Sequence, residues 1–295
     1  MLYLAKHLTR YKYEEPVAQS LSETCLMPRV TAGQRVLRSK LDVHPEPAVF
    51  TERLDYFGNR VASFSVFRSH DQFSITATSL VEVQAPPPAW GTASLPWEQV
   101  HSKMKAPIGE EEIRASEFIF DSPYVRASAP LADFARPSFP AGRPLRQGAL
   151  DLCRRIYTDF RYEPKSTSID TPMLEVMRKR RGVCQDFAHL MVGAMRSLGL
   201  PARYVSGYLR SGTDYQGSEA SHAWVSVYTP GAGWMDLDPT NNVIPSDGHL
   251  TLAWGRDYGD VPPVKGISLG GGKQLIEVEV KVLPVELSAL ETVNQ

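Results

Sequence analysis

The stretch RGVCQDFAHLM, residues 181–191, decides how the rest of the chain is interpreted. From Phe187 to Leu198 apolar residues recur at spacings of three and four, which is typical of a helix with one buried face. The pattern stops at Gly199, a residue that often ends helices. Cys184 is therefore expected in the first turn, where free backbone N–H groups and the helix dipole favour an anion such as a thiolate. We expect Cys184 to be a nucleophile.

Two later segments supply candidate partners for this cysteine. Residues 221–228, SHAWVSVY, alternate like a strand and carry His222 near their start. Residues 233–240, GWMDLDPT, predict a shorter strand after a turn rich in glycine and proline. Cysteine, histidine and aspartate then follow one another in the order of a nucleophile, its base and the group that orients the base. The predicted catalytic residues are Cys184, His222 and Asp238.

The geometry of a hairpin tests whether these side chains can meet. Side chains alternate between the two faces of a strand, so His222 and Asp238 share a face only if the loop has an odd number of residues. A three-residue loop that pairs Tyr228 with Ala232 places His222 directly opposite Asp238. Asp236 lies on the same face and competes for the orienting role. We favour Asp238 because the proline after it ends the strand, which places this aspartate at the end of the sheet.

His189 competes with His222 as the base. It follows Cys184 by five residues on the same helix, so its side chain points about 140° away around the axis. We therefore interpret His189 as a structural histidine. The spacing of Cys184 and His189 is also poor for a metal clamp, and no Cys-x-x-Cys pair occurs. We expect neither a metal ion nor a cofactor.

The composition excludes several classes of protein. The 295 residues are 42% hydrophobic and carry a net charge of −1, so neither nucleic acid nor an anionic membrane is an expected partner. No apolar run approaches the roughly 20 residues that span a bilayer, and the N-terminus does not have the pattern of a signal peptide. The three cysteines, Cys25, Cys153 and Cys184, do not suggest a disulfide framework. We expect a cytoplasmic location.

The chain divides into three predicted parts. Residues 1–88 contain alternating strands, notably at 73–83, and predict an antiparallel β-sandwich-like domain that ends at three prolines. Residues 89–143 are expected to connect the domains through short, packed helices. Residues 144–295 are the predicted catalytic core, in which helices come first and strands, including a last one at 275–282, follow. Helices followed by an antiparallel sheet define an α+β fold.

These motifs together resemble the transglutaminase-like superfamily in its bacterial form. The resemblance rests first on three segments in order: GVCQDFA at 182–188, HAWV at 222–225 and DPT at 238–240. Further matching segments are GLPARYVSGY at 199–208, GRDY at 255–258, DVPP at 260–263, and, in the preceding β domain, HLTRY at 7–11, PR at 28–29 and DYFGN at 55–59. The resemblance implies a papain-like core in which Cys184, His222 and Asp238 fall on the catalytic triad of the family.

The resemblance implies acyl transfer from an amide, either a glutamine side chain or a peptide bond, in a protein or peptide substrate. Cys184 would attack the carbonyl, His222 would protonate the leaving amine, and Asp238 would fix the imidazole. The backbone N–H of Cys184 is a candidate oxyanion donor. An amine acceptor gives crosslinking, whereas water gives the hydrolysis of a cysteine protease, amidase or deamidase. A binding scaffold that keeps the fold without catalysis is the third alternative, and the oligomeric state stays open.

Overall fold

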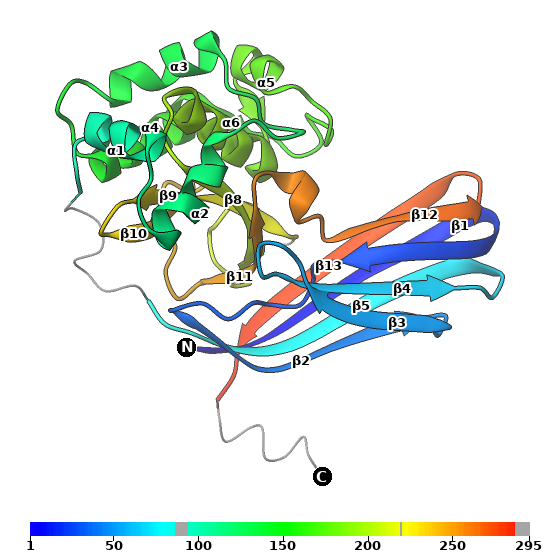
Figure 1. Ribbon diagram of the computed structural model, residues 1–295. Coiled ribbons are helices and arrows are strands. Elements are labelled where there is room, and N and C mark those ends of the chain that lie inside the picture. The colour runs from blue at the N-terminus through cyan, green and yellow to red at the C-terminus, as the bar shows by residue number, and fades with distance from the viewer. Residues whose placement is uncertain (86–93, 219, 287–295) are drawn as a thin grey trace.

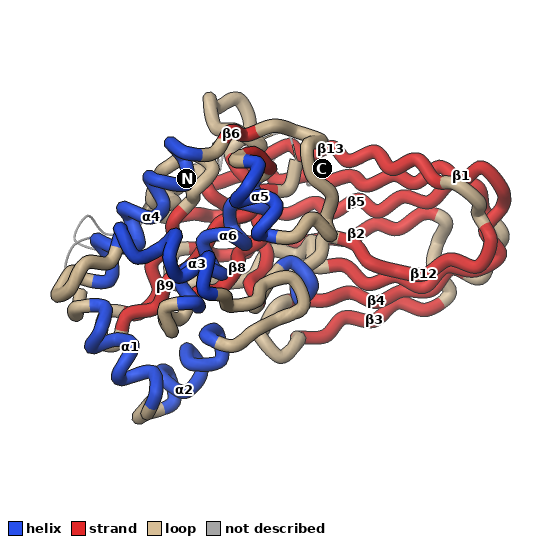
Figure 2. Tube along the Cα trace, turned by 90° about the horizontal axis from the view of Figure 1, so that it is seen from above, coloured by secondary structure: helices blue, strands red, loops and turns tan. Residues whose placement is uncertain are grey.

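The computed structural model describes residues 1–85, 94–218 and 220–286 (Figure 1). A group of helices covers a small sheet, and a second, larger sheet extends away from them. Seen from above, the long strands of the larger sheet project from one side of the helical part (Figure 2). The expected boundary at prolines 86–88 lies outside the described residues.

The larger sheet is antiparallel and is built around one long strand. Its members are β1 (Leu2–Thr24), β2 (Gln34–His44), β3 (Val49–Leu54), β4 (Arg60–Val66), β5 (His70–Val83), β12 (Val264–Gly270) and β13 (Gln274–Pro284). The first half of β1 pairs with β5 and β13, and its second half pairs with β4 and β12. The pairing with β5 is irregular between Lys12 and Val17. There the sheet curls around a second apolar cluster that includes Phe64, Phe73 and Ile75, which gives the expected sandwich-like domain.

The end of the chain returns to this first sheet. β13 pairs with β1 along its length, from Tyr3 opposite Pro284 to Tyr13 opposite Gln274. The sequence prediction assigned 275–282 to the catalytic core, and that assignment is wrong. The alternating pattern identified a strand with one buried face, but it carries no information about which sheet the strand joins.

The second part of the molecule combines helices with a four-stranded antiparallel sheet. The helices are α1 (Trp97–Lys105), α2 (Glu110–Ser116), α3 (Ala129–Ala135), α4 (Leu145–Asp159), α5 (Met173–Lys179) and α6 (Cys184–Ser197). The strands are β8 (Ala202–Leu209), β9 (His222–Thr229), β10 (Gly233–Leu237) and β11 (His249–Gly255), in the spatial order β10-β9-β8-β11. Helices before an antiparallel sheet confirm the expected α+β class.

Helix α6 is the centre of this part. Every residue from Asp186 to Arg196 is buried, and α6 packs on β8, β9 and α3. The Arg196 side chain donates to the carbonyl oxygens of Phe118, Phe120, Ala202 and Arg256. A single buried guanidinium therefore fastens the segment after α2 (including the 3-10 turn Glu117–Ile119) to the end of α6.

Two amide side chains join the parts of the molecule. The Gln34 side chain accepts from Thr251 N–H at 2.8 Å and donates to the Thr251 carbonyl at 2.7 Å. Asn59 forms the same pair of bonds with Trp254, at 3.0 and 2.8 Å. Both partners lie on β11, the edge strand of the smaller sheet, whose outer backbone groups would otherwise lack a neighbouring strand. The two amides cap this edge and fix the orientation of the first sheet against the core.

Candidate active site

Cys184 is the first residue of α6 and is partly exposed, unlike the buried residues that follow it. The Asp186 carboxylate accepts from the Val183 N–H at 2.8 Å and from the Thr167 hydroxyl at 2.6 Å, which caps the helix start. Just before it, β7 (Arg181–Gly182) pairs in parallel with β6 (Arg161–Tyr162). This pairing and the cap together hold the thiol at the N-terminus of the helix, where an anion is favoured.

His222 and Asp238 are in contact. The His222 Nε2 donates to Asp238 Oδ2 at 2.8 Å, and both side chains are almost completely buried, at 1% and 0% exposed. The hairpin loop has three residues, as expected, but it is shifted by one position: Gly233 pairs with Thr229. Continuing this register places Asp238 opposite Trp224, so it is a diagonal rather than a direct neighbour of His222. An odd loop keeps both residues on one face in either register, so the contact survives the shift.

Asp238 is held by five hydrogen-bond donors. Besides His222, its carboxylate accepts from His249 Nε2 at 3.2 Å and Asn241 Nδ2 at 2.8 Å. The backbone N–H groups of Thr240 and Asn241 donate to the other oxygen at 2.9 and 3.2 Å. Burial alone would raise the pKa of Asp238, but His222 and His249 hold that pKa well below its usual range. Asp238 is therefore a fixed negative charge at neutral pH.

His222 interacts with this carboxylate and is close enough to Cys184 to feel its charge. Burial by itself lowers the pKa of His222, but Asp238 and, to a smaller extent, the hydrogen bond and charge of Cys184 raise it to about 10. Asp238 occupies Nε2, so Nδ1 is the ring nitrogen left for Cys184, although no well-aligned hydrogen bond reaches it. Gly217 adjoins the same nitrogen, since a Cβ there would lie 2.8 Å from it. The imidazole is thus placed to be positively charged beside the thiol.

Two tyrosines lie near the sulfur. Burial and the charge of Cys184 raise the pKa of Tyr162 to about 12, and the same two effects are the largest that raise the pKa of Tyr204. Tyr162 stands opposite Gly182 in the β6–β7 pair, two residues before Cys184. Tyr162 could not be predicted from the sequence, because a two-residue parallel pairing across about 20 residues leaves no periodic pattern.

The two competing residues have other partners. The Asp236 carboxylate accepts from Trp224 Nε1 at 3.1 Å. His189 accepts from the Tyr258 backbone N–H at 3.1 Å, and its ring stacks on Tyr124 with centroids 5.9 Å apart. Burial lowers the pKa of His189 to about 4, so the ring is neutral at neutral pH. These contacts agree with a structural role for His189.

His249 and Asn241 also belong to the site, and the sequence did not predict them. His249 comes from β11, which pairs with β8 rather than with β10, so its approach to Asp238 follows only from the sheet order. Asn241 also accepts from the Gln216 N–H at 2.8 Å and thereby connects the loop after β8 to Asp238.

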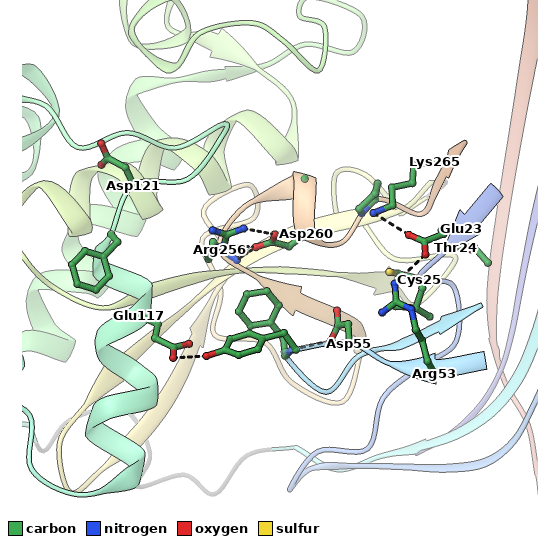
Figure 3. Close-up of a pocket in the computed structure, with 16 residues that line it drawn as sticks. Glu23, Thr24, Cys25, Arg53, Asp55, Glu117, Asp121, Arg256, Asp260 and Lys265 are labelled. Carbon is green, nitrogen blue, oxygen red and sulfur yellow. Dashed lines mark hydrogen bonds and ion pairs between the residues drawn. The ribbon is translucent and has the colours of Figure 1, made fainter. Parts of the chain in front are cut away.

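The other cysteines are less suited to be nucleophiles. Cys25 lines a cavity of about 560 Å³ between the first sheet and the core (Figure 3). Burial raises the pKa of Cys25 to about 12 and raises that of Cys153 as well, so both remain protonated thiols at neutral pH. The basic side chains of that cavity are all paired with acids: Arg53 binds Glu23 at 3.0 Å, Lys265 binds Glu23 at 3.2 Å, and Arg256 binds Asp260 at 2.9 Å.

Comparisons with known proteins place the chain in a family. Residues 3–82 match the bacterial transglutaminase-like N-terminal region, and residues 134–239 match the transglutaminase-like superfamily. An uncharacterized protein of Mycobacterium tuberculosis is 39% identical, over 98% of this chain and 94% of its own length. A protein-glutamine gamma-glutamyltransferase of Pseudomonas aeruginosa is 32% identical, over 39% of this chain and 18% of its own length.

A solved structure has the same fold. It is that of a proposed cysteine protease from Cytophaga hutchinsonii, which aligns with a TM-score of 0.74 and 23% identity over 97% of this chain and 92% of that one. The fold therefore defines a papain-like transglutaminase core preceded by an antiparallel β domain. The chain belongs to the transglutaminase-like superfamily and carries the N-terminal region of its bacterial members, which confirms the resemblance found in the sequence. None of the described helices is both long enough and apolar enough to cross a bilayer.

Proposed function

We propose that the protein is a cysteine-dependent enzyme that transfers acyl groups from amide bonds through a thioester on Cys184. The observation that carries this proposal is the environment of His222. One ring nitrogen is bonded to a buried carboxylate at 2.8 Å, and Asp238 together with the nearby Cys184 raises the pKa of the ring to about 10. A histidine that is charged at neutral pH stabilises a neighbouring thiolate as an ion pair.

The proposed reaction begins when the Cys184 thiolate attacks the amide carbonyl of a glutamine side chain or peptide bond. The carbonyl oxygen becomes an oxyanion, and His222 gives its Nδ1 proton to the departing nitrogen as the carbonyl re-forms. Asp238 keeps the imidazole in one orientation and stabilises its charged form. An acceptor amine or water then attacks the thioester, returns a proton to His222 and releases the cysteine.

Two donors are assigned to the oxyanion. The first is the backbone N–H of Cys184, which has no partner inside the helix because it lies in the first turn. The second is the Tyr162 hydroxyl. We assign this role because the hydroxyl is near both Cys184 and His222. The charge of Cys184 raises the pKa of Tyr162. The hydroxyl would also lie 3.6 Å from a Cβ at Gly217, the residue that adjoins His222.

The substrate class we propose is a protein or peptide amide. The likeness to a protein-glutamine gamma-glutamyltransferase favours an amine as the acceptor, whereas a protease or deamidase would use water. The expected cytoplasmic location remains a prediction. A non-catalytic scaffold would have no use for a charged histidine beside an accessible thiol, which favours an enzyme.

Alkylation of Cys184 tests the proposal directly. We expect iodoacetamide to modify Cys184 well below pH 8 and His222→Ala to abolish this early reactivity, because the ion pair is lost. Site-resolved mass spectrometry across pH separates Cys184 from Cys25 and Cys153. If Cys184 were alkylated with the pH profile of a free thiol in both the wild type and His222→Ala, the proposal would be wrong.

A second measurement identifies the acceptor. A glutamine peptide is supplied with and without a primary amine, and the products are weighed by mass spectrometry. An amine adduct identifies a transferase, and release of the glutamate product alone identifies a hydrolase. Cys184→Ala is the control, because both products require the thioester.

A further inference from the structure

A second and larger cavity lies beside the one in Figure 3. It has a volume of about 1100 Å³ and shares Asp55, Tyr56, Phe57 and Glu117 with its neighbour. Its other walls come from the loop at 29–33, from α2 and from the face of the smaller sheet that carries Arg203, Trp234 and Trp254. The cavity therefore lies between the β domain and the core.

Arg203 is the unusual group in this cavity. Its side chain is charged, the residue is only 8% exposed, and among the described residues it has no hydrogen-bond or ion-pair partner; its Nε is completely buried. The guanidinium carbon lies 3.7 Å from the centre of the Trp254 ring and 4.0 Å from that of Trp234. These indoles cover its faces, so its five N–H donors, which lie in the plane of the group, are directed along its edge.

The nearest acid does not satisfy this guanidinium. Asp236 is close enough to oppose the effect of burial on the pKa of Arg203, which nevertheless falls to about 9. However, the Asp236 carboxylate accepts from Trp224 instead and makes no ion pair with Arg203 among the described residues. Arg203 is thus still charged at neutral pH and lacks the acceptor that buried guanidiniums ordinarily have.

The other charged groups of the cavity narrow the class of ligand. Arg114 pairs with Glu110 at the rim, and Arg29 donates to the Phe57 carbonyl at 3.1 Å and to Asn59. Of the three guanidiniums in the lining, only Arg203 donates no hydrogen bond among the described residues. The lining also holds five carboxylates, those of Asp55, Glu110, Glu111, Glu117 and Asp236. This surplus of negative charge repels a phosphate or a polyanion more strongly than it repels a monoanion, and a single guanidinium can pair with a single carboxylate.

We propose that this cavity is a binding site for a single carboxylate, which Arg203 receives through its edge as a two-pronged ion pair. The carboxylate belongs either to the C-terminus of a peptide or to a small organic acid. The site is distinct from Cys184 and does not depend on the proposed acyl transfer. The neighbouring cavity differs in this respect, because its arginines and its lysine already form ion pairs with acids (Figure 3).

The test uses the full chain and two tryptophans as reporters. Trp234 and Trp254 touch Arg203, so occupation of its edge should change their fluorescence; calorimetry measures the same binding independently. The probes are acetyl-trialanine with a free carboxylate, its C-terminal amide, propionate and inorganic phosphate. We expect saturable binding of the free acid and a dissociation constant at least about tenfold higher for the amide, since the charge-assisted pair is lost.

Variants separate this site from its surroundings. Arg203→Gln should raise the dissociation constant for the acid at least about tenfold, and Arg203→Lys should recover only part of it because a lysine lacks the fork. Arg114→Gln removes the same charge from the rim and should change binding less than about twofold, because that guanidinium is exposed and already paired. Cys184→Ala should bind as the wild type does, which makes the result independent of catalysis.

The possible results either support or exclude a carboxylate site at Arg203. Tight binding of the tripeptide acid alone identifies a peptide C-terminus, and equal binding of propionate identifies a small acid; both support the site. Equal affinity for acid and amide, stronger binding of phosphate, unchanged binding in Arg203→Gln, or the absence of saturable binding to the wild type overturns it. The comparison of acid with amide uses the wild type alone, so it stands even if a variant fails to fold.

Discussion

The charge on His222 makes the stability of the fold depend on pH. Its pKa is about 10 in the folded protein and about 6.5 in an unfolded chain. The stabilisation is complete below pH 6.5 and is lost as the pH rises to 10, because the unfolded chain releases this proton first. We expect the free energy of unfolding to fall across this window by up to about 1.4 kcal/mol per pH unit. Urea denaturation between pH 6 and 10 measures it.

His222→Gln is the control for this pH dependence. Other groups titrate in the same window, but they are common to both proteins, so the difference between the two curves isolates the histidine. We expect the variant to have a flatter profile. Parallel profiles would show that His222 is not charged in the folded protein.

Asp238 and Asp236 offer a matched pair of substitutions. Asp238→Asn puts an amide among five donors and should lower the rate of Cys184 alkylation at pH 7 by about 10²–10⁴, because the imidazolium loses its counter-charge. Asp236→Asn, whose carboxylate accepts from Trp224 and not from His222, should change that rate less than about threefold. Timed alkylation followed by mass spectrometry compares the two. The reverse order would assign the orienting role to Asp236.

The sequence could indicate some residues of the site and not others. Cys184, His222 and Asp238 could be predicted because a helix start and two adjacent strands have recognisable local sequence patterns. Tyr162, Asn241 and His249 reach the site through a two-residue parallel pair, a loop and a strand pairing across the sheet. None of these leaves a trace in the local sequence, since pairing partners are set by the packing of the whole core.

Among the elements, β8 carries a glycine that the site requires. Gly207 lies opposite His222, and a Cβ there would lie 2.3 Å from both the Leu250 carbonyl oxygen and the Trp224 ring. The carbonyl is part of β11 and has little freedom to move. We expect Gly207→Ala to lower the free energy of unfolding by about 1–3 kcal/mol and to slow Cys184 alkylation, since Trp224 stacks near His222. Denaturation and alkylation measure the two effects.

Ser206→Ala, the neighbouring position on β8, serves as the comparison for Gly207→Ala. It adds no atom to the sheet and its side chain points to the other face, so alkylation should keep the wild-type rate. If Gly207→Ala behaved like Ser206→Ala, the close approach of β8 and β11 would not be needed.

The positions of the strands could be predicted from the sequence better than the strands with which they pair. The alternation at 73–83 appears in β5 as buried Phe73, Ile75, Ala77, Ser79 and Val81 with half-buried residues between them. The alternation at 275–282 likewise predicted β13. However, β13 joins the first sheet because β1 has one edge paired with β5 and the other edge free to pair with β13. Which edge is free depends on the assembled fold.

At the scale of the whole molecule, the two parts share strands and an apolar cluster. The chain builds five strands of the first sheet, then the core, and then returns to add β12 and β13 beside β1. One apolar cluster includes Tyr3 and Val280 from the first sheet together with Leu190 of α6 and Leu250 of β11. Unfolding either part would expose apolar surface of the other, so we expect a single transition.

Ile75→Ala tests this cooperativity at a distance from the core. Ile75 is fully buried in the second cluster, inside the curled sheet, and its truncation should lower the free energy of unfolding by about 2–5 kcal/mol. None of the five tryptophans belongs to β1–β5, and the four in the described residues lie on α1, β9, β10 and β11, so their fluorescence reports mainly on the core. We expect the urea transition seen by tryptophan to shift together with the one seen by circular dichroism. Thr76→Ala, which removes an adjacent half-buried side chain, should shift both less; an unshifted tryptophan transition in Ile75→Ala would mean that the two sheets unfold independently.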